Sequence, residues 1–347
     1  MAEADDRAEQ DWRAEAARAD ESPLGLARAR AAQPGRGRDA LTPGDIPARG
    51  WRDILWRVFW AIPEDRVLST AGGVAFFTLL SVFPAIATMV SLYGLFADAA
   101  SIRGHLALLH GVVPDGVLAL LGDELSRVAM QRGQRLGLAF VIGLAIALWS
   151  ANSGVAALFD ALNVVYKERE KRSLTRFYAT TFLFTIGGVL FLLTCLAVVV
   201  VLPVALGLLG AATQTERILG ILRWPVLLLA VILALALLYR FGPSRRVAQW
   251  RWVSWGSVAA AALWIGASML FSWYVASFDS YNRIYGSLGT VIGFITWIWL
   301  SAVVVLIGAE LNAETEHQTA RDTTEGRPRP LGARGAVVAD TVGEAKN

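Results

Sequence analysis

Six long apolar segments constrain this chain more than any other feature, because each is long enough to cross a membrane as an α-helix. A hydrocarbon core about 30 Å thick requires roughly 20 apolar residues in helical conformation. The segments are 68–96, 136–166, 177–210, 224–242, 253–278 and 285–311. Because 55% of the residues are hydrophobic and only 18% are charged, lipid is also favoured over water as the solvent. We predict an all-α, polytopic membrane bundle of six transmembrane helices.

The first apolar segment contains Pro84. Proline lacks a backbone N–H and its ring collides with the preceding helical turn, so we predict a kink at Pro84. A kinked helix in a membrane needs neighbours that satisfy the freed carbonyl group.

The regions that flank the apolar segments differ in character. Residues 1–50 and 313–347 are polar and rich in Gly and Pro, and we expect both to be disordered cytoplasmic tails. Residues 51–66 carry apolar and aromatic side chains at helical spacing, typical of an amphipathic helix in the membrane interface. A soluble core helix is the alternative for this segment. The membrane domain then covers residues 51–312.

Arginine and lysine are distributed unevenly among the connections. They are frequent before the first span and after the second and fourth spans, and sparse after the third and fifth. The positive-inside rule therefore predicts that both termini are cytoplasmic. The connection 97–135 contains arginines but is long, so its charge has less influence; we predict an extracytoplasmic loop with one or two short amphipathic helices.

Polar side chains within the spans are unfavourable and therefore informative. Asp160 and Asn163 lie near the end of the second span, and Glu310 and Asn312 lie near the end of the sixth. Carboxylates near helix C-termini are disfavoured by the helix dipole, so we expect cationic or hydrogen-bonding partners. The candidate charge partners from the same side are Arg66, Arg172, Arg245 and Arg246. These carboxylates either lock helix ends near interfacial water or belong to a proton or substrate relay.

Further candidates for a polar pathway are Asn152, Tyr281 and Tyr285. Asn152 lies in the middle of the second span and should face the bundle, either hydrogen-bonding another helix or lining a polar cavity. Tyr281 and Tyr285 mark the connection between the last two spans, where tyrosines commonly anchor a helix at the interface. If the second and sixth helices line a pathway, Asn152, Asp160, Asn163 and Glu310 should converge on one cavity.

Small residues predict where helices approach closely. Gly256 lies in the fifth span, and Gly286, Gly289 and Gly293 lie at the start of the sixth. Such residues allow two helix backbones to pack together.

The sequence offers no pattern for several classes of chemistry. Its three histidines and single cysteine, Cys195, lack metal-ligand spacing. Phosphate-binding loops and nucleophile elbows are also missing from the sequence. The arginines flank the apolar segments, which indicates membrane topology and not a nucleic-acid surface. We predict no catalytic residue, no metal site and no cofactor.

Several short motifs identify a resemblance. They are YGSLG at 285–289, WIWL at 297–300, GAELNA at 308–313, ALFDALNVVY at 157–166 and GGVAFFTLLSVFPAI at 72–86. Together these motifs resemble the YihY/BrkB family of bacterial inner-membrane proteins, over roughly residues 51–314. The resemblance implies six helices and cytoplasmic termini, and it supplies no catalytic motif. Labels within the family include virulence, envelope-lipid export and a ribonuclease activity that we disfavour.

We therefore expect a non-enzymatic, multi-pass protein of the bacterial inner membrane that transports or exports a lipid-like or amphiphilic substrate. A membrane scaffold that binds lipids or partners without transport is the first alternative, and a membrane-embedded enzyme is the second. The expected partners are membrane lipids and a lipid-like substrate, and no nucleic acid. Neither the energy source nor the oligomeric state follows from the sequence.

Overall fold

A computed structural model describes residues 22–96, 134–201, 213–277 and 287–346. Six of its helices are long and apolar enough to cross a membrane. They are α4 (Val67–Phe96), α7 (Gln134–Val165), α8 (Leu174–Leu196), α10 (Thr213–Phe241), α11 (Trp250–Ser277) and α13 (Ser287–Glu316). The predicted all-α class, with six helices able to span a membrane, is confirmed.

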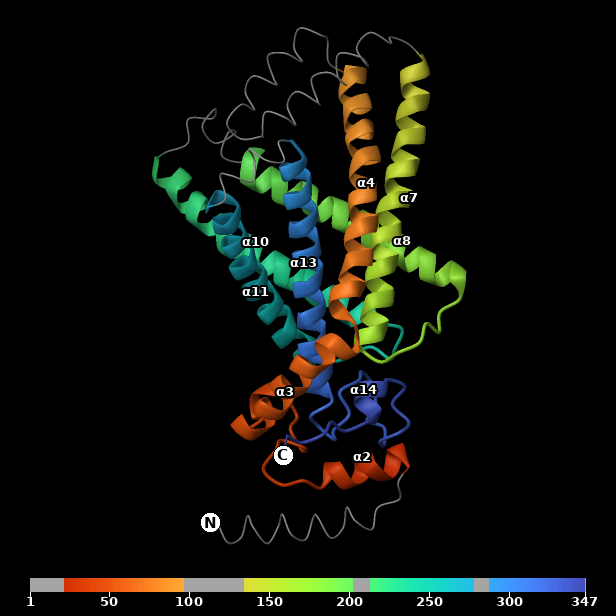
Figure 1. Cartoon of the computed structure of the whole chain (residues 1–347), viewed down its shortest axis with the longest axis vertical. Helices are drawn as coiled ribbons and strands as arrows, with labels where there is room; N and C mark the ends of the chain where they lie inside the picture. Colours follow the sequence, from red (N-terminus) through yellow and green to blue (C-terminus); the bar gives the residue numbers. More distant parts are fainter. Residues whose placement is uncertain (1–21, 97–133, 202–212, 278–286, 347) are drawn as a thin grey trace.

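Some helix boundaries differ from the predicted spans. The helix α10 begins at Thr213, earlier than predicted, and α13 continues to Glu316. The helix α8 passes into a short π-helical stretch, η2 (Ala197–Val201), and the rest of the predicted third span lies outside the described residues. Pro84 lies inside α4, which continues past it to Phe96 (Figure 1).

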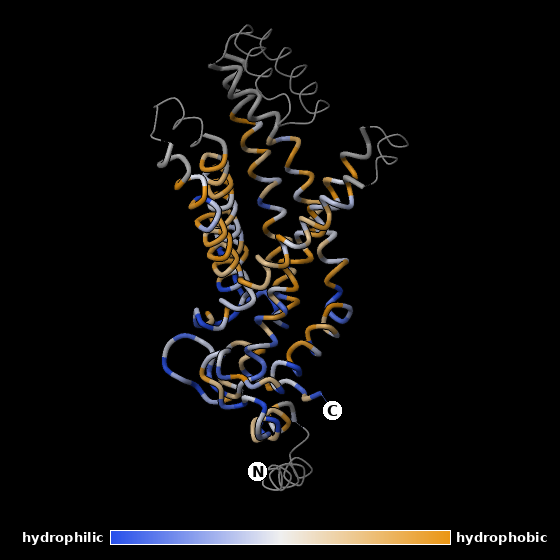
Figure 2. The backbone as a smooth tube through the Cα atoms, turned by 90° about the vertical axis from the view of Figure 1, so that its left-hand side faces the viewer, coloured by the Kyte–Doolittle hydropathy of each residue, from blue (hydrophilic) through white to orange (hydrophobic). Residues whose placement is uncertain are grey.

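The spanning helices pack in a connected series (Figure 1). The helix α4 runs beside α7, while α13 lies against both α4 and α11. The helix α10 packs on α11, and α8 packs on α7. Figure 2 shows that hydrophobic residues dominate these helices and that hydrophilic residues gather at one end of the bundle.

A polar layer covers that end of the bundle (Figure 1). It consists of residues 22–64 and 317–346, which we call the cap, and includes α2 (Pro23–Ala31), η1 (Pro43–Asp45), α3 (Ala48–Glu64) and α14 (Val337–Asp340). Within residues 22–50 and 313–346 the structure differs from the expected disordered tails, and residues 1–21 and 347 lie outside the described residues. In the cap, Arg38 donates hydrogen bonds to the carbonyl oxygens of Gln318 and Gly343, residues from the other end of the chain. Composition gives no sign of such contacts between distant segments.

The amphipathic segment forms α3, but its two faces are not simply polar and apolar. Its inner face buries Ile54 and Val58 together with the charged Asp53 and Arg57. Its outer face exposes Phe59 and other large apolar residues. Asp53 and Arg57 therefore face the C-terminal segment of the cap and not open water.

Burial in the six spans is concentrated next to the cap. The buried side chains of α4 end at Ala75, those of α10 begin at Ala236, and those of α11 end at Ala261. In α8 and α10, only 6% of the spanning window is buried within the chain. Ala147 and Ile298 are buried just beyond the middle of their helices. Among the residues whose side chains are described, burial within the chain is thus concentrated at the capped end, and side chains beyond the middle of the spans are mostly exposed.

Candidate functional site

Glu310 on α13 is a buried acid at the junction between the bundle and the cap. It is 1% exposed, and neither carboxylate oxygen accepts a hydrogen bond from the described part of the chain. An ionised carboxylate that loses water without gaining donors is strongly destabilising. Glu310 therefore requires a proton or a positive charge to be stable where it lies.

Asp65 at the end of α3 faces Glu310, and their carboxyl groups are within hydrogen-bonding reach. Two ionised carboxylates have no hydrogen to share, so a bond between them exists only if one is protonated. Lys167 Nζ donates to both oxygens of Asp65, at 2.8 Å each. Burial alone would lower the pKa of Lys167, but the hydrogen bonds and charge of Asp65 outweigh burial and raise it. Asp65 thus has a cationic partner in direct contact, whereas among the described residues no cation forms an ion pair with Glu310.

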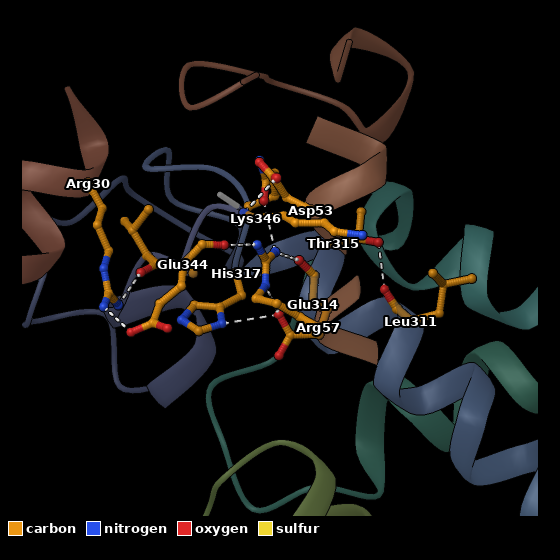
Figure 3. A network of polar contacts seen from close by, with 12 residues as sticks. Arg30, Asp53, Arg57, Leu311, Glu314, Thr315, His317, Glu344 and Lys346 are labelled. Carbon is orange, nitrogen blue, oxygen red and sulfur yellow. Dashed lines mark hydrogen bonds and ion pairs between the residues drawn. The ribbon is translucent and has the colours of Figure 1, made fainter. Parts of the chain in front are cut away.

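Glu314, one turn further along α13, has its charge compensated. Its carboxylate pairs with Arg57, and its Oε2 also lies 3.3 Å from Nδ1 of His317. Arg57 further donates to Gln318 Oε1 at 2.8 Å and to the Glu344 carbonyl oxygen at 2.7 Å. Figure 3 shows this network, in which the Arg57 guanidinium connects α3 to both α13 and the last residues described.

A second set of contacts holds the end of the chain. Asp53 accepts two hydrogen bonds from Arg36, at 2.9 and 2.8 Å, and one from the backbone N–H of Lys346 at 2.9 Å. Arg30 of α2 pairs with Glu344 (Figure 3). The C-terminal segment is thereby fastened across the inner face of α3.

Asn312 joins α13 to α11. Its Oδ1 accepts a hydrogen bond from the Gly256 N–H at 2.7 Å, and its Nδ2 donates to the Val253 carbonyl oxygen at 3.1 Å. A Cβ on Gly256 would lie far inside van der Waals contact with the Gly308 carbonyl oxygen. The close helix approach predicted at Gly256 is present. Asn312 hydrogen-bonds the α11 backbone at this contact and so has a structural role.

Asn163 and Arg172 organise the connection after α7. Asn163 Oδ1 accepts from the Ser244 N–H at 2.7 Å, and its Nδ2 donates to Glu170 Oε2 at 3.1 Å. Arg172 pairs with the same Glu170 and donates to the Gly242 carbonyl oxygen at 2.9 Å. Both residues therefore bind the loop that follows α10 and lie away from Glu310.

The two other predicted cationic partners also point elsewhere. Arg245 is fully buried and pairs with Glu316 at 3.0 and 2.6 Å, above the ring of Tyr166. The Arg246 guanidinium lies beside Gly326, and its Nη1 is buried without a hydrogen-bond partner among the described residues. Sequence reasoning identified cations on the correct side but paired them with the wrong acids, because α13 carries its acids further toward the cap.

Asp160 and Arg66 form no ion pair with the predicted partners in the described segments. Asp160 is exposed on α7 and no hydrogen bond reaches its carboxylate there, although the positive charge of Arg172, one of the predicted partners, acts on it. Arg66 is exposed, with a left-handed φ of 51°, in the turn between α3 and α4. Arg66 forms no ion pair with any acid in the described segments. Tyr281 and Tyr285 lie outside the described residues.

Asn152 is buried and accepts a hydrogen bond from Thr185 Oγ1 at 3.4 Å, which links α7 to α8. Asn152 and Asn163 therefore have separate hydrogen-bond partners, Glu310 has none among the described residues, and Asp160 is exposed. The predicted convergence of these four residues on one cavity is not found.

The outer face of α3 carries a shallow apolar groove. Its lining includes Leu55, Trp56, Phe59 and Trp60, with Arg52 and Lys346 at its polar edge. Phe59 is 66% exposed and Trp60 is 54% exposed. Because α3 leads directly into the first span, this aromatic face lies beside the membrane-spanning region.

The segments that the structure describes contain no group of three or more His, Cys, Asp or Glu side chains arranged to hold a metal ion.

Comparison with known proteins decides the family. A family model described as Virulence factor BrkB matches residues 58–331. The chain belongs to the BrkB family. This BrkB-family protein is 31% identical over 253 residues to the ribonuclease-like protein YfkH of Bacillus subtilis, covering 71% of this chain and 88% of YfkH.

Other BrkB-family relatives are named as membrane proteins. The UPF0761 membrane protein Mpe_A1422 of Methylibium petroleiphilum is 25% identical over 285 residues, which are 80% of this chain and 66% of that protein. A UPF0761 membrane protein of Vibrio campbellii is 27% identical over 261 residues, which are 73% of this chain and 80% of that protein. No solved structure matches the chain significantly. The predicted family is confirmed, and this is a multi-pass membrane protein.

Sequence reasoning missed much of the polar junction in this BrkB-family protein. It treated Arg57 as part of the polar face of an interfacial helix, did not single out Asp65, and assigned Glu314 and Glu316 to a disordered tail. The available signal was the i, i+4 spacing of Glu310 and Glu314, which extends the helical pattern past residue 312.

Proposed function

We propose that this BrkB-family protein transports lipid-like, amphiphilic molecules across the bacterial inner membrane, with the cap on the cytoplasmic side. The observation that carries the proposal is the distribution of packing along the spans. Residues buried within the chain are concentrated next to the cap, whereas the other halves of the spans mostly expose apolar side chains, apart from contacts such as the Trp297–Ser268 hydrogen bond between α13 and α11. A bundle fastened at one end can open and close at the other with small rotations of its helices.

The exposed side chains in the halves of the spans away from the cap favour an amphiphilic substrate over a water-soluble one. Large exposed side chains there are predominantly apolar, including Val141 and Ile142 of α7, Leu190 of α8 and Leu270 of α11. A hydrophilic solute needs polar groups that replace its water, whereas an acyl chain needs apolar surface.

The proposed orientation rests on charge. Basic residues are concentrated in the cap and in the two connections that contact it, which favours the cytoplasm for this side. In a Cys195→Ser background, a cysteine replacing Ser173 should react with an impermeant thiol reagent only after cells are permeabilised. A cysteine replacing Asn282 should react in intact cells. Labelling of the Ser173 position in intact cells would reverse the orientation.

Transport can be measured with the full chain in proteoliposomes. We expect a fluorescent phospholipid analogue to move between leaflets faster than in protein-free vesicles or vesicles with heat-inactivated protein. A labelled sugar trapped in the same vesicles should stay inside. Absence of any lipid movement would remove the transport function.

A non-transporting scaffold is the second candidate. It is favoured by the extensive pairing in the cap and by the separate hydrogen-bond partners of Asn152 and Asn163. A scaffold would retain bound lipid or protein partners through purification but would move no lipid in the vesicle assay. We propose no enzymatic activity for the chain.

A further inference from the structure

The junction next to α13 contains one acid more than its cations compensate. Three acids meet there: Asp65 from the end of α3, and Glu310 and Glu314 from α13. Lys167 neutralises Asp65, and Arg57 neutralises Glu314. Glu310 is left with two oxygen atoms that accept no hydrogen bond within the described structure.

We propose that Glu310 and Asp65 form a proton-binding pair, in which Glu310 carries the proton and donates it in a hydrogen bond to ionised Asp65. Proton uptake converts the Glu310 carboxylate to a carboxylic acid, and release restores the carboxylate. Protonation removes the uncompensated charge and creates the donor that this pair lacks. A divalent metal ion is less suited, because the described residues offer no cluster of three ligands.

Every group that faces Glu310 is consistent with this assignment. Asp65 and Glu314 are acidic, Lys167 is cationic but already occupied by Asp65, and Tyr166 from the end of α7 is buried and neutral. Because Lys167 donates to both oxygens of Asp65, Asp65 already has a positive charge and hydrogen-bond donors beside it, whereas Glu310 has neither donor nor ion pair in the described structure. The shared proton therefore belongs to Glu310.

A route to solvent leads from the pair toward the cap. The side chain of Asp65 is 9% exposed and that of Lys167 is 38% exposed. Glu64, which lies 3.9 Å from Lys167, is 73% exposed. Exposure thus increases stepwise from Glu310 outward, so protons exchange with the capped side of the membrane.

The pair lies beside the main buried apolar cluster, where α3, α4, α7 and α13 contact one another. A change of charge at Glu310 therefore acts on the contacts that fasten these helices. Resting on the proposed transport function, this inference makes proton exchange at Glu310 the step that couples the opening of the bundle to a proton gradient.

Infrared difference spectra of the full chain in lipid nanodiscs, recorded against pH, report the C=O stretch of protonated carboxyl groups. We expect this band at neutral pH in the wild type. It should be lost in Glu310→Gln, and also in Asp65→Asn, which frees Lys167 to neutralise Glu310. Glu64→Gln removes a nearby exposed acid and should retain the band, as should Asp160→Asn. Absence of the band from the wild type, or its persistence in Glu310→Gln, would overturn the proposal.

The variant Glu310→Gln should fold, because its amide can donate to Asp65 as a protonated Glu310 would. In the vesicle assay, a proton gradient should stimulate lipid movement several-fold in the wild type and not in Glu310→Gln. Equal wild-type movement with and without the gradient would overturn the coupling and leave the transport function intact. If the wild type moves no lipid, the transport function fails, and the infrared band alone decides whether the pair holds a proton.

Discussion

Asn312 of α13 accepts a hydrogen bond from the backbone N–H of Gly256 in α11, at 2.7 Å. The missing side chain of Gly256 makes this contact possible, because a Cβ there would collide with both Asn312 and the Gly308 backbone. The two helices are thus fixed at the capped end of the bundle by a polar contact that depends on close backbone approach.

We expect Gly256→Ala to lower the free energy of unfolding by about 1–3 kcal/mol, the usual cost of overpacking a tight contact. Gly266→Ala on the same helix is the matched control, because a Cβ at Gly266 meets no atom within 4 Å. Thermal unfolding in detergent compares the two. Equal stability of both variants would mean that the approach at Gly256 is not needed.

Arg57 should hold the cap together. Replacing it with alanine leaves Glu314 buried without its main cation, and we expect a loss of about 3–5 kcal/mol in stability. Limited proteolysis should then cleave the segment 317–346 more rapidly. Arg52→Ala, an exposed arginine on the same helix, should change neither property.

The double variant Arg57→Met with Glu314→Leu separates charge from packing. Because it removes both members of the pair, it should recover most of the stability that Arg57→Ala loses. A double variant as unstable as Arg57→Ala would show that the hydrogen bonds of Arg57 to Gln318 and Glu344 carry the stabilisation instead.

The stability that the connection after α7 contributes should decrease at acidic pH. Burial opposes ionisation of Glu170, but its hydrogen bonds from Arg172 and Asn163 prevail and lower its pKa from 4.5 to about 2. The native state therefore holds this carboxylate ionised more strongly than the unfolded state does. The resulting stability is complete above pH 4.5 and is lost as the pH falls toward about 2.

Unfolding temperature measured between these pH values tests this expectation. The difference between the wild type and Glu170→Gln should be largest above pH 4.5 and should shrink as the pH falls. A constant difference across the range would exclude Glu170 as the titrating group.

The outer face of α3 should contact lipid. A nitroxide label on a cysteine at Phe59, in a Cys195→Ser background, should collide with dissolved oxygen more than with a water-soluble nickel complex. The same label at Glu64 should show the opposite preference, because Glu64 is exposed at the polar end of the helix. A label at Phe59 accessible chiefly to the nickel complex would place this face in water.

The sequence by itself determined the membrane class, the six spans and the family, because each rests on local information. Twenty apolar residues in succession dictate a spanning helix whatever surrounds them. It also indicated Gly256 as a point of close approach and Asn152 as inward-facing, since a polar amide is unfavourable against lipid.

Tertiary structure alone decided which charges meet. Arg57 and Glu314 are separated by most of the chain, and nothing near either residue in the sequence indicates its partner. For the same reason Arg245 was assigned to the wrong acid, and the polar tails, whose order depends on contacts between the two chain ends, were expected to be disordered. In the folded chain Asp65 and Glu314 each contact a cation, whereas Glu310 is buried without one among the described residues. The sequence could not distinguish Glu310 from the other two acids, because charge compensation depends on distances in space.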